Sequence, residues 1–189
     1  MSTGDTGGMD PDLREFDGRA LYAALDARRE AEGLSWTAAT AAISNLSPAL
    51  DTARAARGLA NHPISPSTLQ SLGRRGDTSC QHALCFLRWL DRTPESFLAG
   101  APLDAGAPLP TCGPDRSLRW DIKAMHAALN ETRASRGQTW VQTAHHLGCG
   151  PSQLTGLRTA RYATAMTLAM RITQWIGRPA ADFTHAALW

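Results

Sequence analysis

The stretch from Trp140 to Ala160, WVQTAHHLGCGPSQLTGLRTA, decides the fold of this chain. It contains two short segments with helical spacing of apolar or small residues, at Thr143, Ala144, Leu147, Cys149, Leu154 and Leu157. Gly148 separates the segments, and a glycine at a helix end adopts a positive φ without a Cβ penalty. Pro151 then stands where proline is favoured, at the first position of a helix. The pattern predicts two helices that meet at a steep angle across a tight turn.

Neighbouring residues support this interpretation of the stretch. Thr139 and Gln142 have the T-x-x-Q spacing of a capping box, which gives the first helix a defined start. Ala144 lies on the face that must touch the second helix, and its small side chain allows the two axes to approach closely. Each local feature therefore agrees with helix, tight turn and helix.

This stretch resembles the helix-turn-helix of the lambda repressor-like family, also called the XRE or Cro type. The resemblance lies in the small Ala144, in the turn glycine Gly148 four residues later, and in the buried positions of both segments. It implies a compact five-helix domain whose second motif helix, Pro151 to Thr159, lies in the major groove of DNA.

The sequence contains the same module twice. Eight positions between residues 16 and 36 recur 104 residues later, as the pairs Asp17/Asp121, Ala20/Ala124, Ala23/Ala127, Ala24/Ala128, Leu25/Leu129, Arg29/Arg133, Gly33/Gly137 and Trp36/Trp140. The match resumes downstream at a shorter offset, with Pro66 to Leu69 against Pro151 to Leu154, and with the pairs Leu72/Leu157, Trp89/Trp175 and Phe97/Phe183. A period of this length indicates tandem domains, because solenoid repeats are shorter.

The repeat defines the expected domains. Residues 1–15 are expected to form a flexible tail, 16–98 the first helix-turn-helix domain, 99–115 a linker rich in proline and glycine, and 116–189 the second domain. In each copy Asp17 or Asp121 is the expected N-cap of the first helix. In the first copy an insertion at residues 44–63 replaces the single turn glycine, and residues 50–57 within it favour a helical turn or two. This insertion departs from the family pattern.

Length and composition describe a soluble globular protein, with 189 residues, 43% hydrophobic and 19% charged. No run of about 18 apolar residues is present, and the first residues lack the basic and apolar regions of a secretion signal. We therefore expect a cytoplasmic protein without a membrane partner. The net charge of +2 is a weak argument for nucleic acid. Eighteen arginines stand against one lysine, which suits phosphate and guanine but also follows from a GC-rich genome.

The remaining residue patterns do not predict chemistry. Cys80, Cys85 and Cys149 fall on helical core positions, and we interpret them as packing residues. His145 with Cys149, and His82 with the first two cysteines, lie close in sequence but lack the spacing of a closed zinc site. No nucleophile has an evident base, and no glycine-rich loop follows a strand. We therefore expect no enzyme activity, no metal and no cofactor.

We predict an all-α protein of two tandem lambda repressor-like five-helix domains, which acts as a sequence-specific DNA-binding transcriptional regulator. Its partner would be double-stranded DNA, and a homodimer or a protein partner is compatible with the sequence. The resemblance implies that DNA is met by Ser67, Thr68, Gln70, Ser71, Arg74, Arg75, Ser152, Gln153, Thr155, Arg158, Thr159 and Arg161. The alternative is a protein-interaction module that keeps the fold without binding DNA. The insertion, the low net charge and Gly156 in the second recognition helix favour it.

Overall fold

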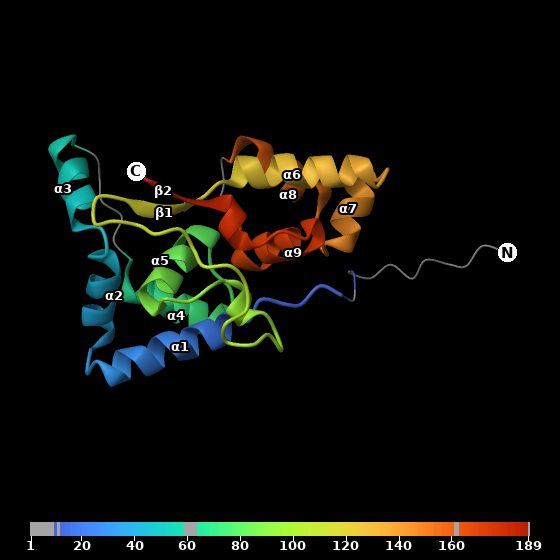
Figure 1. The fold of residues 1–189 in the computed structure, drawn as a ribbon. Coiled ribbons are helices and arrows are strands. Elements are labelled where there is room, and N and C mark those ends of the chain that lie inside the picture. The colour runs from blue at the N-terminus through green and yellow to red at the C-terminus, as the bar shows by residue number, and fades with distance from the viewer. Residues whose placement is uncertain (1–9, 11, 59–63, 161–162, 189) are drawn as a thin grey trace.

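A computed structural model describes residues 10, 12–58, 64–160 and 163–188, and the chain is mostly helical (Figure 1). The first half contains α1 Gly18–Ala31, α2 Trp36–Ser44, α3 Pro48–Ala56, α4 Pro66–Arg75, α5 Cys80–Leu90 and the 3-10 turn η1 Glu95–Phe97. The second half contains β1 Ser117–Trp120, α6 Ile122–Ser135, α7 Trp140–His146, α8 Pro151–Gly156, η2 Leu157–Thr159, α9 Met166–Ile176, η3 Ala180–Phe183 and β2 Thr184–Ala187.

The small sheet is an element that the sequence did not predict. β1 and β2 are antiparallel, with Ser117 opposite Ala187 and Trp120 opposite Thr184. In the first half the equivalent place holds a single antiparallel bridge between Phe16 and Leu98. The expected all-α chain is therefore mostly helical with one two-stranded sheet, formed where the segment before α6 meets the segment after η3.

Both predicted N-caps are confirmed, and they share one further contact. The Asp17 side chain accepts from the Ala20 N–H, and the Asp121 side chain accepts from the Ala124 N–H. The backbone N–H of Asp17 donates to Phe97 O at 2.8 Å, and that of Asp121 donates to Phe183 O at 2.7 Å. Each first helix is therefore anchored at its start to the closing 3-10 turn of its own half.

The repeated tryptophans are held in the same way in both halves. The Arg29 guanidinium lies 4.9 Å from the Trp36 ring centre, whose other neighbour is the Tyr22 ring. In the second half Arg133 lies 4.8 Å from the Trp140 ring centre, and His126 stacks on that ring at 5.4 Å. These contacts fix the start of α2 and of α7 against the preceding helix, so the sequence repeat is also a repeat of side-chain contacts.

The two halves meet at equivalent residues. Ser79 and Ala165 form an antiparallel bridge, in which Cys80 N donates to Thr164 O at 2.8 Å and Met166 N donates to Thr78 O at 2.7 Å. Residues 78, 79 and 80 of the first copy correspond to 164, 165 and 166 of the second, at the offset that also relates Trp89 to Trp175. A contact in which residue i meets j and j meets i requires a two-fold relation. In Figure 1, α1 runs along the lower edge and α6 along the upper edge, in opposite directions.

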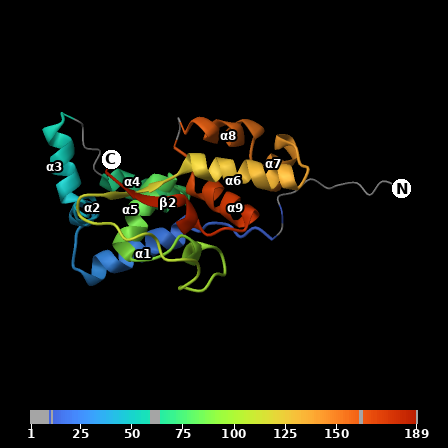
Figure 2. The same cartoon turned by 45° about the horizontal axis from the view of Figure 1, so that its top comes forward.

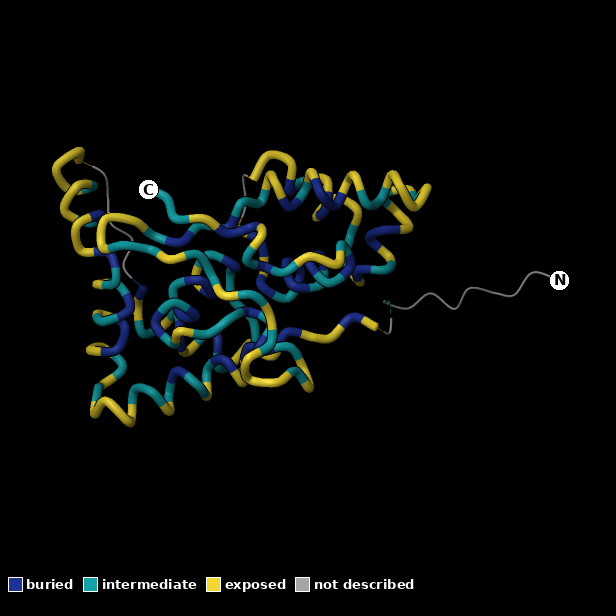
Figure 3. Tube along the Cα trace, viewed as in Figure 1, coloured by how far each residue is buried: buried dark blue, intermediate teal, exposed yellow. Residues whose placement is uncertain are grey.

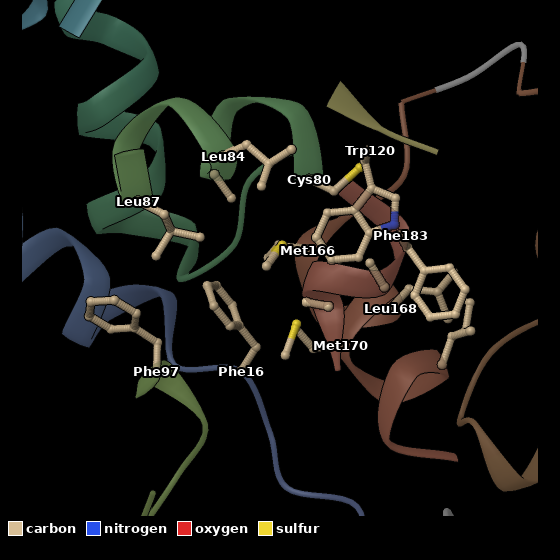
Figure 4. Packing of buried hydrophobic residues seen from close by; sticks show 14 of the residues in the cluster. Phe16, Cys80, Leu84, Leu87, Phe97, Trp120, Met166, Leu168, Met170 and Phe183 are labelled. Atoms are coloured by element: carbon tan, nitrogen blue, oxygen red, sulfur yellow. The ribbon is translucent and has the colours of Figure 1, made fainter. Parts of the chain in front are cut away.

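One hydrophobic core spans the two halves (Figure 4). Leu84 and Leu87 of α5 face Met166 and Met170 of α9, and Phe16 lies between them. Figure 3 shows the buried residues gathered along α5 and α9 in the middle of the molecule. Cys80 is buried in this core, where desolvation raises the pKa of its thiol to about 11. The cysteine is therefore a packing residue, as predicted.

Residues 12–15, which the sequence assigns to the flexible tail, lie against the rest of the chain. Residues 1–9 and 11 lie outside the described residues, but Leu13 is buried. Arg14 N donates to Gln174 Oε1 at 2.9 Å, and Gln174 Nε2 donates back to Arg14 O at 2.9 Å. The sequence placed residues 12–15 in the tail because they are polar, whereas these reciprocal bonds hold them against α9.

The insertion and the linker are tied to the first half by one arginine. The insertion contains α3, near the helical turns expected at residues 50–57, while residues 59–63 lie outside the described residues. Arg88 Nη2 donates to Leu46 O and to Cys112 O, both at 2.8 Å. The Ser47 hydroxyl donates to Arg116 O at 2.5 Å. The linker therefore lies along the insertion and carries no helix or strand within residues 99–115.

We call α4, and α8 together with η2, the two recognition segments. The residues that end them provide a stability test. Ala160 ends η2 with φ +49°, a conformation that costs a residue with a Cβ roughly 1–2 kcal/mol. The corresponding cap of α4 is Gly76, with φ +69°. We expect Ala160→Gly to raise the free energy of unfolding by about 0.5–1 kcal/mol, because relieved strain exceeds the added entropy of the unfolded chain. We expect Gly76→Ala to lower it by about 1 kcal/mol.

Urea unfolding monitored by tryptophan fluorescence would measure both variants. An Ala160→Gly protein that is less stable than the unaltered chain would contradict the claim that the backbone of Ala160 is strained.

Candidate nucleic-acid interface

The second motif has the predicted helix, turn and helix. Gly148 has φ +60°, and Cys149 N donates back to Ala144 O at 2.9 Å, which reverses the chain. The capping box of α7 is present, with Gln142 N donating to the Thr139 hydroxyl and Thr139 N donating to Gln142 Oε1. The predicted helix 151–159 is α8 followed by the 3-10 turn η2. Its buried residues are Leu154 and Leu157.

The first motif keeps its buried positions despite the insertion. Ile43 and Ile64, which stand directly before and after the insertion and take the places of Leu147 and Cys149 in the second copy, are both buried. Ile64 N donates to the Ser44 hydroxyl at 3.2 Å, which joins the two ends of the insertion. Because its ends meet, the insertion extends outward as a loop and leaves the end of α2 beside the start of α4.

The predicted DNA-facing residues lie at the surface wherever the structure describes them. In α4 four are exposed, namely Ser67, Gln70, Arg74 and Arg75, and two are half-buried, Thr68 and Ser71. In the second motif all five described residues are exposed, namely Ser152, Gln153, Thr155, Arg158 and Thr159. Arg161 lies outside the described residues. Both recognition segments are therefore accessible from solvent.

The polar side chains of the two segments are held by different internal hydrogen bonds. The Ser65 hydroxyl contacts the Ser67 hydroxyl at 2.7 Å and the Thr68 hydroxyl at 3.1 Å, which places a cluster of hydroxyls at the start of α4. In α8, Gln153 Oε1 accepts from the Gly150 N–H at 2.8 Å. A glutamine pairs with adenine through both ends of its side-chain amide. The side chain must therefore leave this cap before it can read a base with two bonds.

The described arginines of the two segments have no counter-charge within the described part of the chain. None of Arg74, Arg75 and Arg158 forms an ion pair with another residue in the described part of the chain. Burial lowers the pKa of His126, and the nearby Arg158 guanidinium lowers it further. The imidazole is therefore neutral at pH 7, and Arg158 carries the charge at this place.

The two recognition segments lie on one side of the molecule. From Figure 1 to Figure 2, α8 passes from below α6 to above it, and α4 passes from below α5 to above it. Because the top of the molecule comes forward in this turn, both helices lie behind their neighbours in Figure 1. The same relative placement of the equivalent helices α4 and α8 agrees with a two-fold relation of the halves.

Comparison with protein-family models, curated proteins and solved structures gave no match. Within the described residues, no helix has the length and apolar character needed to cross a bilayer. The functional assignment therefore depends on the repeat and on the geometry of α4 and α8.

Arg171 is a residue of the site that sequence reasoning missed. Its Nη1 lies 3.2 Å from Leu147 O and 3.4 Å from Gly148 O, and its Nη2 binds the Glu15 carboxylate at 2.8 and 3.0 Å. These bonds hold the motif turn from α9 and link it to the segment before α1. No local pattern marks such a residue, because its partners are 24 and 156 residues away.

We expect Arg171→Met to lower the free energy of unfolding by about 1–2 kcal/mol, because hydrogen bonds to a charged group are removed while two carbonyls and a carboxylate stay behind. Arg57→Met, at an exposed position just after α3, is the control and should change it by no more than about 0.5 kcal/mol. Thermal unfolding measures both. Equal effects of the two substitutions would mean that Arg171 does not hold the turn.

Proposed function

We propose that this chain is a sequence-specific DNA-binding regulator in which two lambda repressor-like helix-turn-helix domains form an internal dimer. The observation that carries the proposal is the reciprocal pairing of Ser79 with Ala165, which relates the two motifs by a two-fold axis. Single-domain proteins of this type need two chains to place two recognition helices on two half-sites about one helical turn apart. Here one chain presents α4 and α8 on the same side.

In the proposed mechanism, different side chains contact the phosphates and the bases. Arg74, Arg75, Arg158 and Arg161 neutralise phosphates, which fixes the register of the chain on the duplex without reading its sequence. Gln70 and Gln153 reach base edges in the major groove. Because the axis inverts one motif relative to the other, the two half-sites are inverted. Since the two helices differ in sequence, the half-sites also differ in sequence.

A protein-interaction role has less support. A docking face for a protein needs a contiguous apolar patch. The exposed large apolar residues in the described ranges are Leu103, Val141 and Leu188, which belong to the linker, to α7 and to the end of the chain. They are scattered over three segments, whereas Arg74, Arg75 and Arg158, which form no ion pair with another described residue, lie on the two recognition segments.

Selection of bound fragments from a random DNA pool, at two salt concentrations, tests the proposal. The expected result is an enriched site with two inverted and unequal half-sites. No enrichment at either salt concentration would remove DNA as the partner and leave the interaction module as the better account.

We expect Arg74→Ala and Arg158→Ala each to weaken binding to specific and random DNA alike. Removing one phosphate neighbour should reduce the slope of log K against log salt by about 0.9, because fewer counter-ions are released. Arg178→Ala is the control, since Arg178 is paired with Asp182 outside both motifs. Fluorescence anisotropy across a salt series measures the slopes. An unchanged slope in both variants, or an equal change in the control, would contradict the assignment.

We expect Gln70→Ala to relax the base preference at one position of one half-site, at a cost of about 1–3 kcal/mol for the preferred base. Its effect should exceed that of Gln153→Ala at the other half-site, because the Gln153 amide oxygen already accepts from Gly150. Competition with single-base variants of the selected site measures both. A uniform loss of affinity at all positions would instead assign Gln70 to the phosphate backbone.

A further inference from the structure

A cavity of about 420 Å³ lies where the insertion meets the rest of the chain. Its walls come from the end of α2, from α3, from α5 and from β1, so both halves of the molecule contribute. Ser44 and Ile64, whose hydrogen bond closes the base of the insertion, are both part of the wall. The size is within the usual range of small-molecule sites, roughly 300–1,000 Å³.

The body of the cavity is apolar. Six aliphatic side chains line it, namely Ile43, Leu46, Leu50, Ile64, Leu84 and Leu118. The second copy has no insertion, so this wall is specific to the first. Such a lining binds the apolar part of a ligand by removing its surface from water.

The charged groups in the wall have an excess of positive charge. They are three arginines, Arg54, Arg88 and Arg119, and one carboxylate, Asp51. His82 also lines the cavity, and burial lowers the pKa of its imidazole, which keeps it neutral at pH 7. The Nη atoms of Arg88 donate to backbone carbonyls and to the Ser47 hydroxyl, and no carboxylate is among these acceptors.

Arg119 gives the cavity wall a positive charge with no counter-charge among the described residues. Its Nε is buried and has no hydrogen-bond partner, and Arg119 forms no ion pair with another described residue. The guanidinium of Arg119 is therefore a positive charge in the cavity wall, and an anion that enters the cavity can pair with it. A carboxylate is the acceptor that matches the planar fork of arginine.

We propose that this cavity binds a small organic carboxylate with an apolar body. The carboxylate pairs with Arg119, and the apolar body fills the space between α3, α5 and β1. Because the ligand would touch both ends of the insertion and the first strand of the second half, its binding also changes the DNA affinity of the chain. This last consequence rests on the proposed function, whereas the binding itself does not.

Isothermal titration calorimetry with 4-phenylbutyrate on the full chain tests the site, with 4-phenylbutan-1-ol as the uncharged match. We expect saturable binding of the acid and at least tenfold weaker binding of the alcohol. Arg119→Gln should weaken binding of the acid at least tenfold without changing binding of the alcohol, and Arg119→Lys should restore part of the lost affinity for the acid. Arg57→Gln, on the same helical insertion but outside the cavity wall, is the control and should bind as the unaltered chain does.

Equal binding of acid and alcohol, or no saturable binding of the acid, would overturn the proposal. A melting control shows whether Arg119→Gln is folded. If it is not, two measurements still test the proposal: binding of the acid by Arg119→Lys, and binding of the acid and the alcohol by the unaltered chain. Anisotropy with the selected DNA forms the second arm. A shift in DNA affinity on adding the acid supports the coupling, and an unchanged affinity removes the coupling alone. Acid binding by a chain that selects no DNA would mean that the proposed function fails while the carboxylate site stands.

Discussion

The reciprocal backbone bridge between Ser79 and Ala165 is the constraint on which the rest of the structure depends. Each half is small enough that its own core would give only modest stability. The bridge places α5 against α9, so that the apolar stripes of both halves close one core around Cys80 and Met166. Because both partners in the bridge come from equivalent positions, it also sets the orientation of everything attached to α5 and α9.

The orientation has a direct consequence for the two recognition segments. α4 ends at Arg75, shortly before Ser79, and η2, which follows α8, ends at Thr159, shortly before Ala165. α4 and α8 lie on the same side of the molecule in Figures 1 and 2. The two helices differ in the side chains that they present. α4 presents a cluster of hydroxyl groups at its start and the exposed Gln70, whereas in α8 Gly156 has no side chain and Gln153 caps its own helix. Under the proposed function, these differences predict an unequal pair of half-sites.

Local features of the chain could be predicted from the sequence because their causes are local. The N-caps at Asp17 and Asp121, the turn at Gly148 and the helix within the insertion all depend on residues within a few positions of one another. The sheet, the ordered residues 12–15, the Arg171 contacts and the cavity could not be predicted, since each depends on how distant segments meet. The repeat indicated two copies, but only the contacts of Thr78 to Cys80 with Thr164 to Met166 gave their relation.

The central claim is that one chain places two motif helices on one duplex about an internal two-fold axis. Hydroxyl-radical footprinting of the selected DNA, with the stoichiometry of the complex measured in parallel, tests it most directly. The account predicts one chain per site and two protected regions on the same face of the duplex, about ten base pairs apart. A single protected region, or two chains required for two regions, would contradict it.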